Sequence, residues 1–140
     1  MSDRSFVDTN VLIYLYSPES KKHDIARQIL TSPTNPSTFV ISTQVVGEFV
    51  NVCLKRSLLT PAELMGILEL FADTFEIIRP GIATLREALR LQVRYGYSWW
   101  DSVIIASAIE AECMVLITED MQAGQVIDES VRIVNPFTLG

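Results

Sequence analysis

Short apolar runs alternate with longer segments of helical periodicity along this chain. The runs lie at residues 5–8, 38–41, 75–78, 114–117 and 131–134. They are rich in valine, isoleucine and phenylalanine, which favour β-strands. Strands that alternate with helical segments are typical of a parallel sheet covered by helices. We therefore expect an α/β fold with about five strands, formed by a single domain over residues 1–140.

Between these runs, apolar side chains recur at the spacing of amphipathic helices. The predicted helices cover residues 11–16, 21–30, 43–55, 61–71, 82–95 and 99–112. Two of them begin with the pattern of a capping box, in which Thr60 pairs with Glu63 and Ser98 with Asp101. Residues 31–37 contain two prolines and are predicted to be a loop.

Carboxylates follow two of the predicted strands. Asp8 closes the first run, and Asp120 comes just after the fourth. Side chains at the carboxyl ends of parallel strands meet in the crevice where α/β sheets bind ligands. Asp101, at a predicted helix start, and Glu48, on the third predicted helix, are acids that the same fold can bring there. Because gathered acids repel one another, we expect a cation to offset the repulsion, most simply a hard divalent ion with oxygen ligands.

Each of these acids also has an ordinary structural explanation. Asp8 can form an Asx turn that caps the next helix. Asp101 can be the reciprocal acid of its capping box. Glu48 lies on the polar face of a predicted helix, and exposure of that face to solvent would explain its charge. Asp120 lies in a polar turn, where an acid is equally ordinary. No single acid decides between a ligand and a structural role, so the metal hypothesis depends on all four together.

The formal net charge of −6 is unevenly distributed. Residues 1–100 balance ten acids with ten bases, whereas residues 101–140 carry seven acids and one base. An isoelectric point near 4.7 argues against nucleic-acid binding through a broad basic face. Arg86, Arg90 and Arg94 recur every four residues and form a local basic stripe, for which a solvated helix face is the alternative explanation.

Other common chemistries lack their residues. Cys53 and Cys113 have no Cys-x-x-Cys spacing and are expected to be buried, reduced thiols. His23 stands alone on a polar helix start, which argues against serine or cysteine triads. The glycine-rich motifs of dinucleotide and P-loop proteins are absent. Asp8 is followed at the second position by Asn10, so the paired aspartates of aspartyl-phosphate enzymes are absent as well. The remaining role for the acids is to hold Mg²⁺ or Mn²⁺ against a phosphodiester.

The apolar composition bears on location and partners. No apolar run approaches the ~18 residues of a membrane span, and the N-terminus lacks the features of a signal peptide. We therefore expect a soluble, cytoplasmic protein with no membrane contact. The apolar fraction of 49% is high for such a protein and leaves apolar surface for a partner. The apolar helix at residues 11–16 is the segment that the sequence suggests for this contact.

Four segments resemble the motifs of PIN domains. They are FVDTNVLIY at residues 6–14, QVVGEF at 44–49, YSWWDSVI at 97–104 and LITEDMQAGQ at 116–125. The resemblance spans nearly the whole chain and preserves the order and spacing of the four acids. The chain length resembles that of VapC-type toxins from bacterial toxin–antitoxin pairs. The resemblance implies a three-layer α/β/α, Rossmann-like domain with strand order 3-2-1-4-5, and cleavage of RNA by a metal-activated water.

The resemblance also implies roles for individual residues. Asp8 and Asp101 would be the principal ligands of Mg²⁺ or Mn²⁺, and Asp120 would complete the metal site, directly or through water. Glu48 would hold a metal-bound water or a second ion. Two further residues would support the carboxylates by hydrogen bonds, namely Asn10 and Thr118. Glu119 remains an open competitor of Asp120 as a ligand.

The expected partners follow from the same resemblance. A VapC-type toxin would form a homodimer and bind a cognate antitoxin, which could place an arginine or lysine among the carboxylates. The alternatives are a PIN-like module that acts mainly by protein binding, or a solitary nuclease without an antitoxin.

Overall fold

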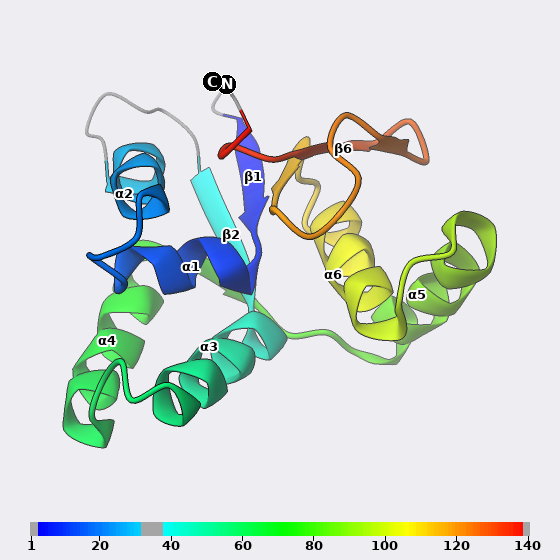
Figure 1. Cartoon of the computed structure of the whole chain (residues 1–140). Coiled ribbons are helices and arrows are strands. Elements are labelled where there is room, and N and C mark those ends of the chain that lie inside the picture. Colours follow the sequence, from blue (N-terminus) through cyan, green and yellow to red (C-terminus); the bar gives the residue numbers. More distant parts are fainter. Residues whose placement is uncertain (1–2, 32–37, 139–140) are drawn as a thin grey trace.

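The structure of the chain is a computed structural model that describes residues 3–31 and 38–138. Six strands form one sheet with helices on both faces (Figure 1). The strands are β1 (Arg4–Val7), β2 (Thr38–Ser42), β3 (Glu76–Ile78), β4 (Val115–Ile117), β5 (Val126–Ile127) and β6 (Val131–Val134). Their order is β3-β2-β1-β4-β6-β5, and only the β5–β6 pair is antiparallel. This confirms the order 3-2-1-4-5, because the fifth predicted strand is β6. Most of the predicted loop at 31–37 lies outside the described residues.

The additional strand, β5, gives no signal in the sequence. It pairs with β6 across a three-residue turn, Asp128 to Ser130, in which Asp128 and Glu129 have φ angles of 50° and 56°. Turns with two left-handed residues are usually recognised in a sequence by Asn-Gly or Asp-Gly. Because this turn has no glycine, the hydrophobic pattern alone does not predict the hairpin.

The helices cover both faces of the sheet and confirm the three-layer architecture. They are α1 (Thr9–Leu15), α2 (Lys22–Thr31), α3 (Thr43–Lys55), α4 (Pro61–Thr74), α5 (Ile82–Tyr95) and α6 (Trp99–Glu110). Figure 1 shows α1 to α4 on one side of the sheet and α5 and α6 on the other. The capping box of Thr60 and Glu63 is present. Helix α1 begins directly after Asp8, two residues earlier than predicted, so the first acid stands at its N-terminus.

The core is centred on β1, which lies between β2 and β4. Phe6 pairs with Val40 on one side and Leu116 on the other, and all three side chains are fully buried. Helix α6 is buried on nearly every side, since every residue from 102 to 108 is buried. Strands and a helix packed on both sides are typical of a parallel α/β core. The acid at the start of α6 is therefore carried by a rigid element.

The apolar segment at residues 11–16 is not the free surface that the sequence suggests. Val11, Leu12 and Ile13 are buried in the core, and the other residues of the segment pack against it. The apolar pattern correctly predicts a helix here, but it does not indicate which faces of that helix the sheet covers. Large exposed apolar side chains lie elsewhere, including Leu89 and Val93 on α5.

The two cysteines and the histidine lie outside the group of acids. Cys53 and Cys113 are buried free thiols, as predicted. The ring of His23 contacts the Tyr14 carbonyl oxygen at 2.9 Å, away from the four acids. Within residues 3–31 and 38–138, no helix is long and apolar enough to cross a membrane.

The predicted basic stripe on α5 is partly neutralised. Arg90 is paired with Glu87 and with Asp128, and Arg94 lies 3.8 Å from the Asp128 carboxylate. Arg86 is exposed. Two of the three arginines thus tie α5 to the β5–β6 turn, which weakens the case for a nucleic-acid surface there.

Candidate active site

The pairing of β1 with β4 brings the first and last acidic segments together. Val7 and Ile117 are opposite each other at the ends of the two strands, and the Asp8 amide donates to the Ile117 carbonyl at 3.0 Å. The next residue after each strand, Asp8 or Thr118, therefore leaves the sheet at the same edge. The Asp8 carboxylate accepts a hydrogen bond from the Thr118 hydroxyl at 2.8 Å across 110 residues of sequence.

Asp8 is the most deeply buried of the four acids, with 4% of its surface exposed. Burial raises the pKa of this carboxyl to about 6, and the charges of Asp101 and Asp120 act in the same direction. Hydrogen bonds from Thr118 and from the Thr9 amide oppose the rise. The contact with Thr9, 2.7 Å long, also caps α1. Asp8 thus has the capping role proposed as its structural alternative, yet it also lies within the electrostatic reach of two other acids.

This raised pKa predicts an unusual pH dependence of stability in metal-free protein. A carboxyl whose folded pKa lies above its unfolded pKa binds protons more tightly in the folded state. Its stabilising contribution is complete below about pH 4 and is lost as the pH rises through about 6. The difference amounts to about 3 kcal/mol for Asp8.

We expect urea unfolding with a chelator present to show this effect as a difference between two proteins. From pH 4 to 7 the free energy of unfolding of the wild type should fall relative to that of Asp8→Asn, which cannot titrate at this position. The subtraction removes the other carboxyls, including Glu119, whose lowered pKa acts in the opposite direction. If the two free energies of unfolding instead change in parallel with pH, burial does not raise the pKa of Asp8.

Asn10 and Thr118 connect Asp8 with Asp120. The Asn10 amide nitrogen donates to Asp120 Oδ2 at 2.9 Å and lies 3.4 Å from Asp8 Oδ2. The Thr118 hydroxyl, which donates to Asp8, accepts the backbone N–H of Asp120 at 3.2 Å. Both residues therefore hydrogen-bond to carboxylates of the group.

Glu48 faces the other acids rather than solvent alone. Its Oε2 accepts from the Thr9 hydroxyl at 3.1 Å, and its Oε1 accepts from the Gln44 amide at 2.8 Å. The same Gln44 nitrogen lies 3.4 Å from the carbonyl oxygen of Trp100, the residue before Asp101. Gln44 and Thr9 were not predicted as site residues, although both stand within the motif segments. Gln44 thus bridges α3 to the start of α6.

Asp101 is half-buried at the N-terminus of α6. Its backbone amide donates to Ser98 Oγ at 3.2 Å, but in the described chain no bond returns from the Ser98 N–H to the Asp101 carboxylate. The capping box is thus only half formed. Burial raises the pKa of Asp101, the hydrogen bond from Ser98 lowers it, and the charges of Asp120 and Glu48 raise it again. The charges of the four acids therefore interact.

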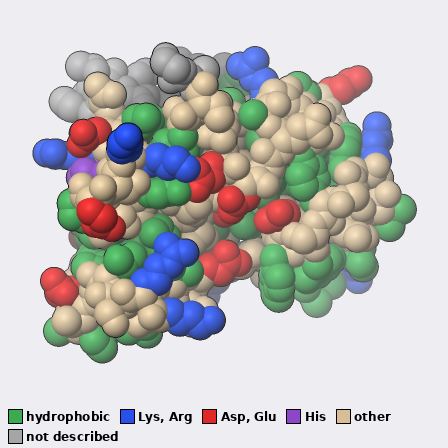
Figure 2. Space-filling view, in the orientation of Figure 1, with side chains coloured by type: hydrophobic (Ala, Val, Ile, Leu, Met, Phe, Trp, Pro, Cys, Tyr) green, Lys and Arg blue, Asp and Glu red, His purple; other side chains and the backbone are tan. Residues whose placement is uncertain are grey.

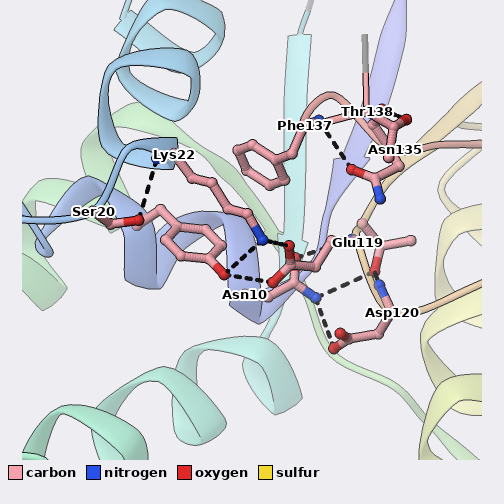
Figure 3. Close-up of polar contacts among 10 residues, drawn as sticks. Asn10, Ser20, Lys22, Glu119, Asp120, Asn135, Phe137 and Thr138 are labelled. Atoms are coloured by element: carbon pink, nitrogen blue, oxygen red, sulfur yellow. Dashed lines mark hydrogen bonds and ion pairs between the residues drawn. The ribbon is translucent and has the colours of Figure 1, made fainter. Parts of the chain in front are cut away.

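The structure separates Glu119 from Asp120. Both carboxylate oxygens of Glu119 are engaged, one by the Tyr14 hydroxyl at 2.6 Å and the other by Lys22 Nζ at 2.5 Å (Figure 3). Lys22 also lies over the rings of Tyr14 and Phe137. Although partial burial acts to raise it, these two donors lower the pKa of Glu119. Asp120 instead points toward Asn10 (Figure 3), which favours it over Glu119 as the fourth acid.

The donor set suits a hard divalent cation. All four acids offer oxygen ligands, and burial, together with the smaller effect of repulsion among the acids, raises the pKa of Asp8 and of Asp101. Among the described residues, however, no three acidic, histidine or cysteine side chains already stand as ligands of one ion. The Gln44 side-chain oxygen is buried without a hydrogen-bond partner, so the site retains an unused acceptor.

A cavity of about 490 Å³ opens beside the acids, between α1 and α3; we call it the α1–α3 pocket. Tyr14, Asn51 and Arg56 are among its lining residues, and four acids line it as well, namely Glu19, Glu48, Glu119 and Asp120. Figure 2 shows acidic side chains gathered in the middle of this face, with basic side chains beside them. The acids thus border a space large enough for a small organic group.

The acids lie at the carboxyl edge of a parallel sheet, where Asn10 and Thr118 hold Asp120 and Asp8 by hydrogen bonds. The sequence comparison identifies the class of protein to which this site belongs. Residues 5–127 match the family model of the PIN domain, and the chain belongs to this family. No curated protein matches the chain at significant similarity.

Among solved structures, the chain is similar to VapC toxins and their complexes. A toxin–antitoxin complex from Klebsiella pneumoniae has 25% sequence identity and a TM-score of 0.70, covering 94% of this chain and 97% of that one. VapC20 of Mycobacterium tuberculosis, a sarcin–ricin loop cleaving toxin, has 19% identity and a TM-score of 0.67, with 80% and 86% covered. DNA-bound VapBC from Salmonella typhimurium has 19% identity and a TM-score of 0.64, with 95% and 97% covered.

Proposed function

We propose that this chain is a Mg²⁺- or Mn²⁺-dependent endoribonuclease and the toxin of a VapBC-type pair. The observation that carries the proposal is that four separate segments of the chain place Asp8, Glu48, Asp101 and Asp120 near enough for their charges to interact. Membership of the PIN family supports nuclease activity, and the similarity to VapC structures supports the toxin class. A protein-binding module that had lost catalysis would not need to keep all four acids beside an open pocket.

In this proposal Asp8, Asp101 and Asp120 hold the ion. A bound divalent ion would offset the charge of the phosphate and lower the pKa of a water molecule, so that its proton is lost to solvent and the hydroxide can attack the phosphorus. Thr118 and Thr9 hold Asp8 in place and favour its ionised form, which ligation requires. Asn10 fixes the position of Asp120 beside Asp8.

Glu48 would orient water rather than serve as a principal ligand. Gln44 and Thr9 each donate a hydrogen bond to one of its two oxygens and so hold the carboxylate in place. The remaining lone pairs of these oxygens can accept hydrogen bonds from water. Since no histidine stands among the described site residues, proton handling falls to carboxylates and water.

The proposal includes the expected partners. The antitoxin would bind over the acids and insert a basic side chain among them, which would replace the charge of the ion. The homodimer would use apolar surface such as that of α5, where Leu89 and Val93 are exposed. A cytoplasmic location, in which RNA and antitoxin are both accessible, completes this proposal.

The proposal is tested with purified protein and labelled oligonucleotides. We expect single-stranded RNA to be cut in the presence of Mg²⁺ or Mn²⁺ and to remain intact with a chelator, and DNA of the same sequence to be cut poorly. Protein carrying Asp101→Asn, purified identically, controls for contaminating ribonucleases. Equal cleavage by both proteins, or none by the wild type on any RNA, would contradict the enzyme and favour a binding module.

A further inference from the structure

The α1–α3 pocket has a cation among its lining residues, eight positions along the chain from Glu48, besides its four acids. Among the described residues, Arg56 is the only lysine or arginine that lines it. Its guanidinium makes no ion pair within the described part of the chain, whereas Lys22, Arg90 and Arg94 are all paired with carboxylates. An arginine on a pocket wall without a carboxylate partner is available to an anionic ligand.

The geometry of α3 links this cation to the acids. Glu48, Val52 and Arg56 are spaced four residues apart and line the same pocket. The first and last of them are separated by about 12 Å along the helix axis. One wall of the pocket therefore runs from an acid of the site to an unpaired base.

This polarity fits a polyanion that lies across the site. A strand whose scissile phosphate rests on the ion held by the acids must pass its neighbouring phosphates over a protein of net charge −6. Those phosphates need their own counter-charge, and among the described lining residues only Arg56 supplies it. Asn51, exposed on the same wall, offers an amide that can donate to and accept from a base edge.

We propose that the α1–α3 pocket is the subsite for the nucleotide next to the scissile bond, with Arg56 contacting its phosphate. The inference rests on the proposed ribonuclease function and adds a residue and a path for the substrate. A guanidinium can bind a phosphate through two parallel hydrogen bonds, which sets the position of the strand as well as its affinity. Arg56 would thus be a substrate-binding residue on a chain that otherwise repels RNA.

The test compares Arg56→Gln with Lys55→Gln. The two changes remove the same charge from adjacent exposed positions at the end of α3, but Lys55 does not line the pocket. Binding of a fluorescein-labelled, random-sequence, single-stranded RNA is measured over a range of salt in the Asp101→Asn background. We expect Arg56→Gln to weaken binding about tenfold or more and to reduce the slope of log K against log salt by about 0.7. Lys55→Gln should change both quantities little.

Cleavage kinetics separate this proposal from the function on which it rests. With Asp101 intact, Arg56→Gln should raise KM and leave kcat nearly unchanged, and Arg56→Lys should keep the salt slope but lose part of the affinity. If the wild type cuts RNA but the two glutamine variants bind it equally well, the subsite is wrong and the ribonuclease stands. If the wild type neither binds nor cuts RNA, both proposals fall. If Arg56→Gln weakens only an acidic protein partner, the pocket belongs to that partner and not to RNA.

Discussion

Replacing Asp101 by asparagine should abolish RNA cleavage while leaving the fold intact. The change removes one of the proposed principal ligands, and a bound ion contributes several kcal/mol of charge stabilisation in the transition state. A loss of this size reduces the rate by about a thousandfold. Asp8→Asn should have the same effect for the same reason. The measurement is single-turnover cleavage of an RNA that the wild type cuts.

Stability distinguishes this role of Asp101 from simple helix capping. Burial and the neighbouring charges already disfavour the ionised form of Asp101 in metal-free protein. An uncharged asparagine should therefore be neutral or slightly stabilising there. Asp73→Asn, on the exposed face of α4, is a matched control for both activity and melting. Full activity of Asp101→Asn would contradict the mechanism, whereas a large loss of stability without metal would assign the acid to capping.

Divalent ions should raise the melting temperature of the free protein without any substrate or partner. Ligand at 100 times its dissociation constant adds about 2.7 kcal/mol to stability, which in a domain of this size corresponds to roughly 5–10 °C. Mg²⁺ and Mn²⁺ should both produce the shift. Ca²⁺ should stabilise as well but support little cleavage, because its looser coordination positions water poorly.

The shift should also depend on the carboxylates in a defined way. As the pH falls below the pKa of Asp8, about 6, protons compete with the ion and the shift should shrink. Asp101→Asn should reduce it at every pH, and NaCl at matched ionic strength should not reproduce it. The absence of a divalent-specific shift at millimolar ion in antitoxin-free protein would mean that the acids do not form a competent site.

The sequence predicted the features that depend on local pattern and strand order. Asp8 and Asp120 follow buried strands, and parallel strands end at a common edge, so the hydrophobic pattern alone was enough to predict their proximity. The start of α6 could be placed in the same way from Ser98. These inferences needed only hydrophobic periodicity and a small set of helix-start residues.

Other features depend on tertiary contacts that periodicity does not contain. Glu119 and Asp120 are equivalent in the sequence, and only the positions of Tyr14 and Lys22 distinguish them. Gln44 belongs to a polar stripe that contact with solvent would explain equally well, until the start of α6 is placed beside it. The pocket with Arg56 arises from the packing of α1 against α3. Such pairings require the fold and cannot be deduced from one helix at a time.

The bond between Asp8 and Thr118 has a consequence for how the protein appears during translation. The two residues are 110 positions apart, so the site cannot form until β4 has left the ribosome and paired with β1. At a synthesis rate of about 5–20 residues per second, roughly 6–20 s separate the emergence of the two residues. A nascent chain in this interval carries Asp8 without its hydroxyl donor and without Asp120. If the chain is the toxin proposed here, a ribosome that stalls early releases a fragment without a complete active site. An antitoxin that binds over the acids can then do so only on nearly complete chains.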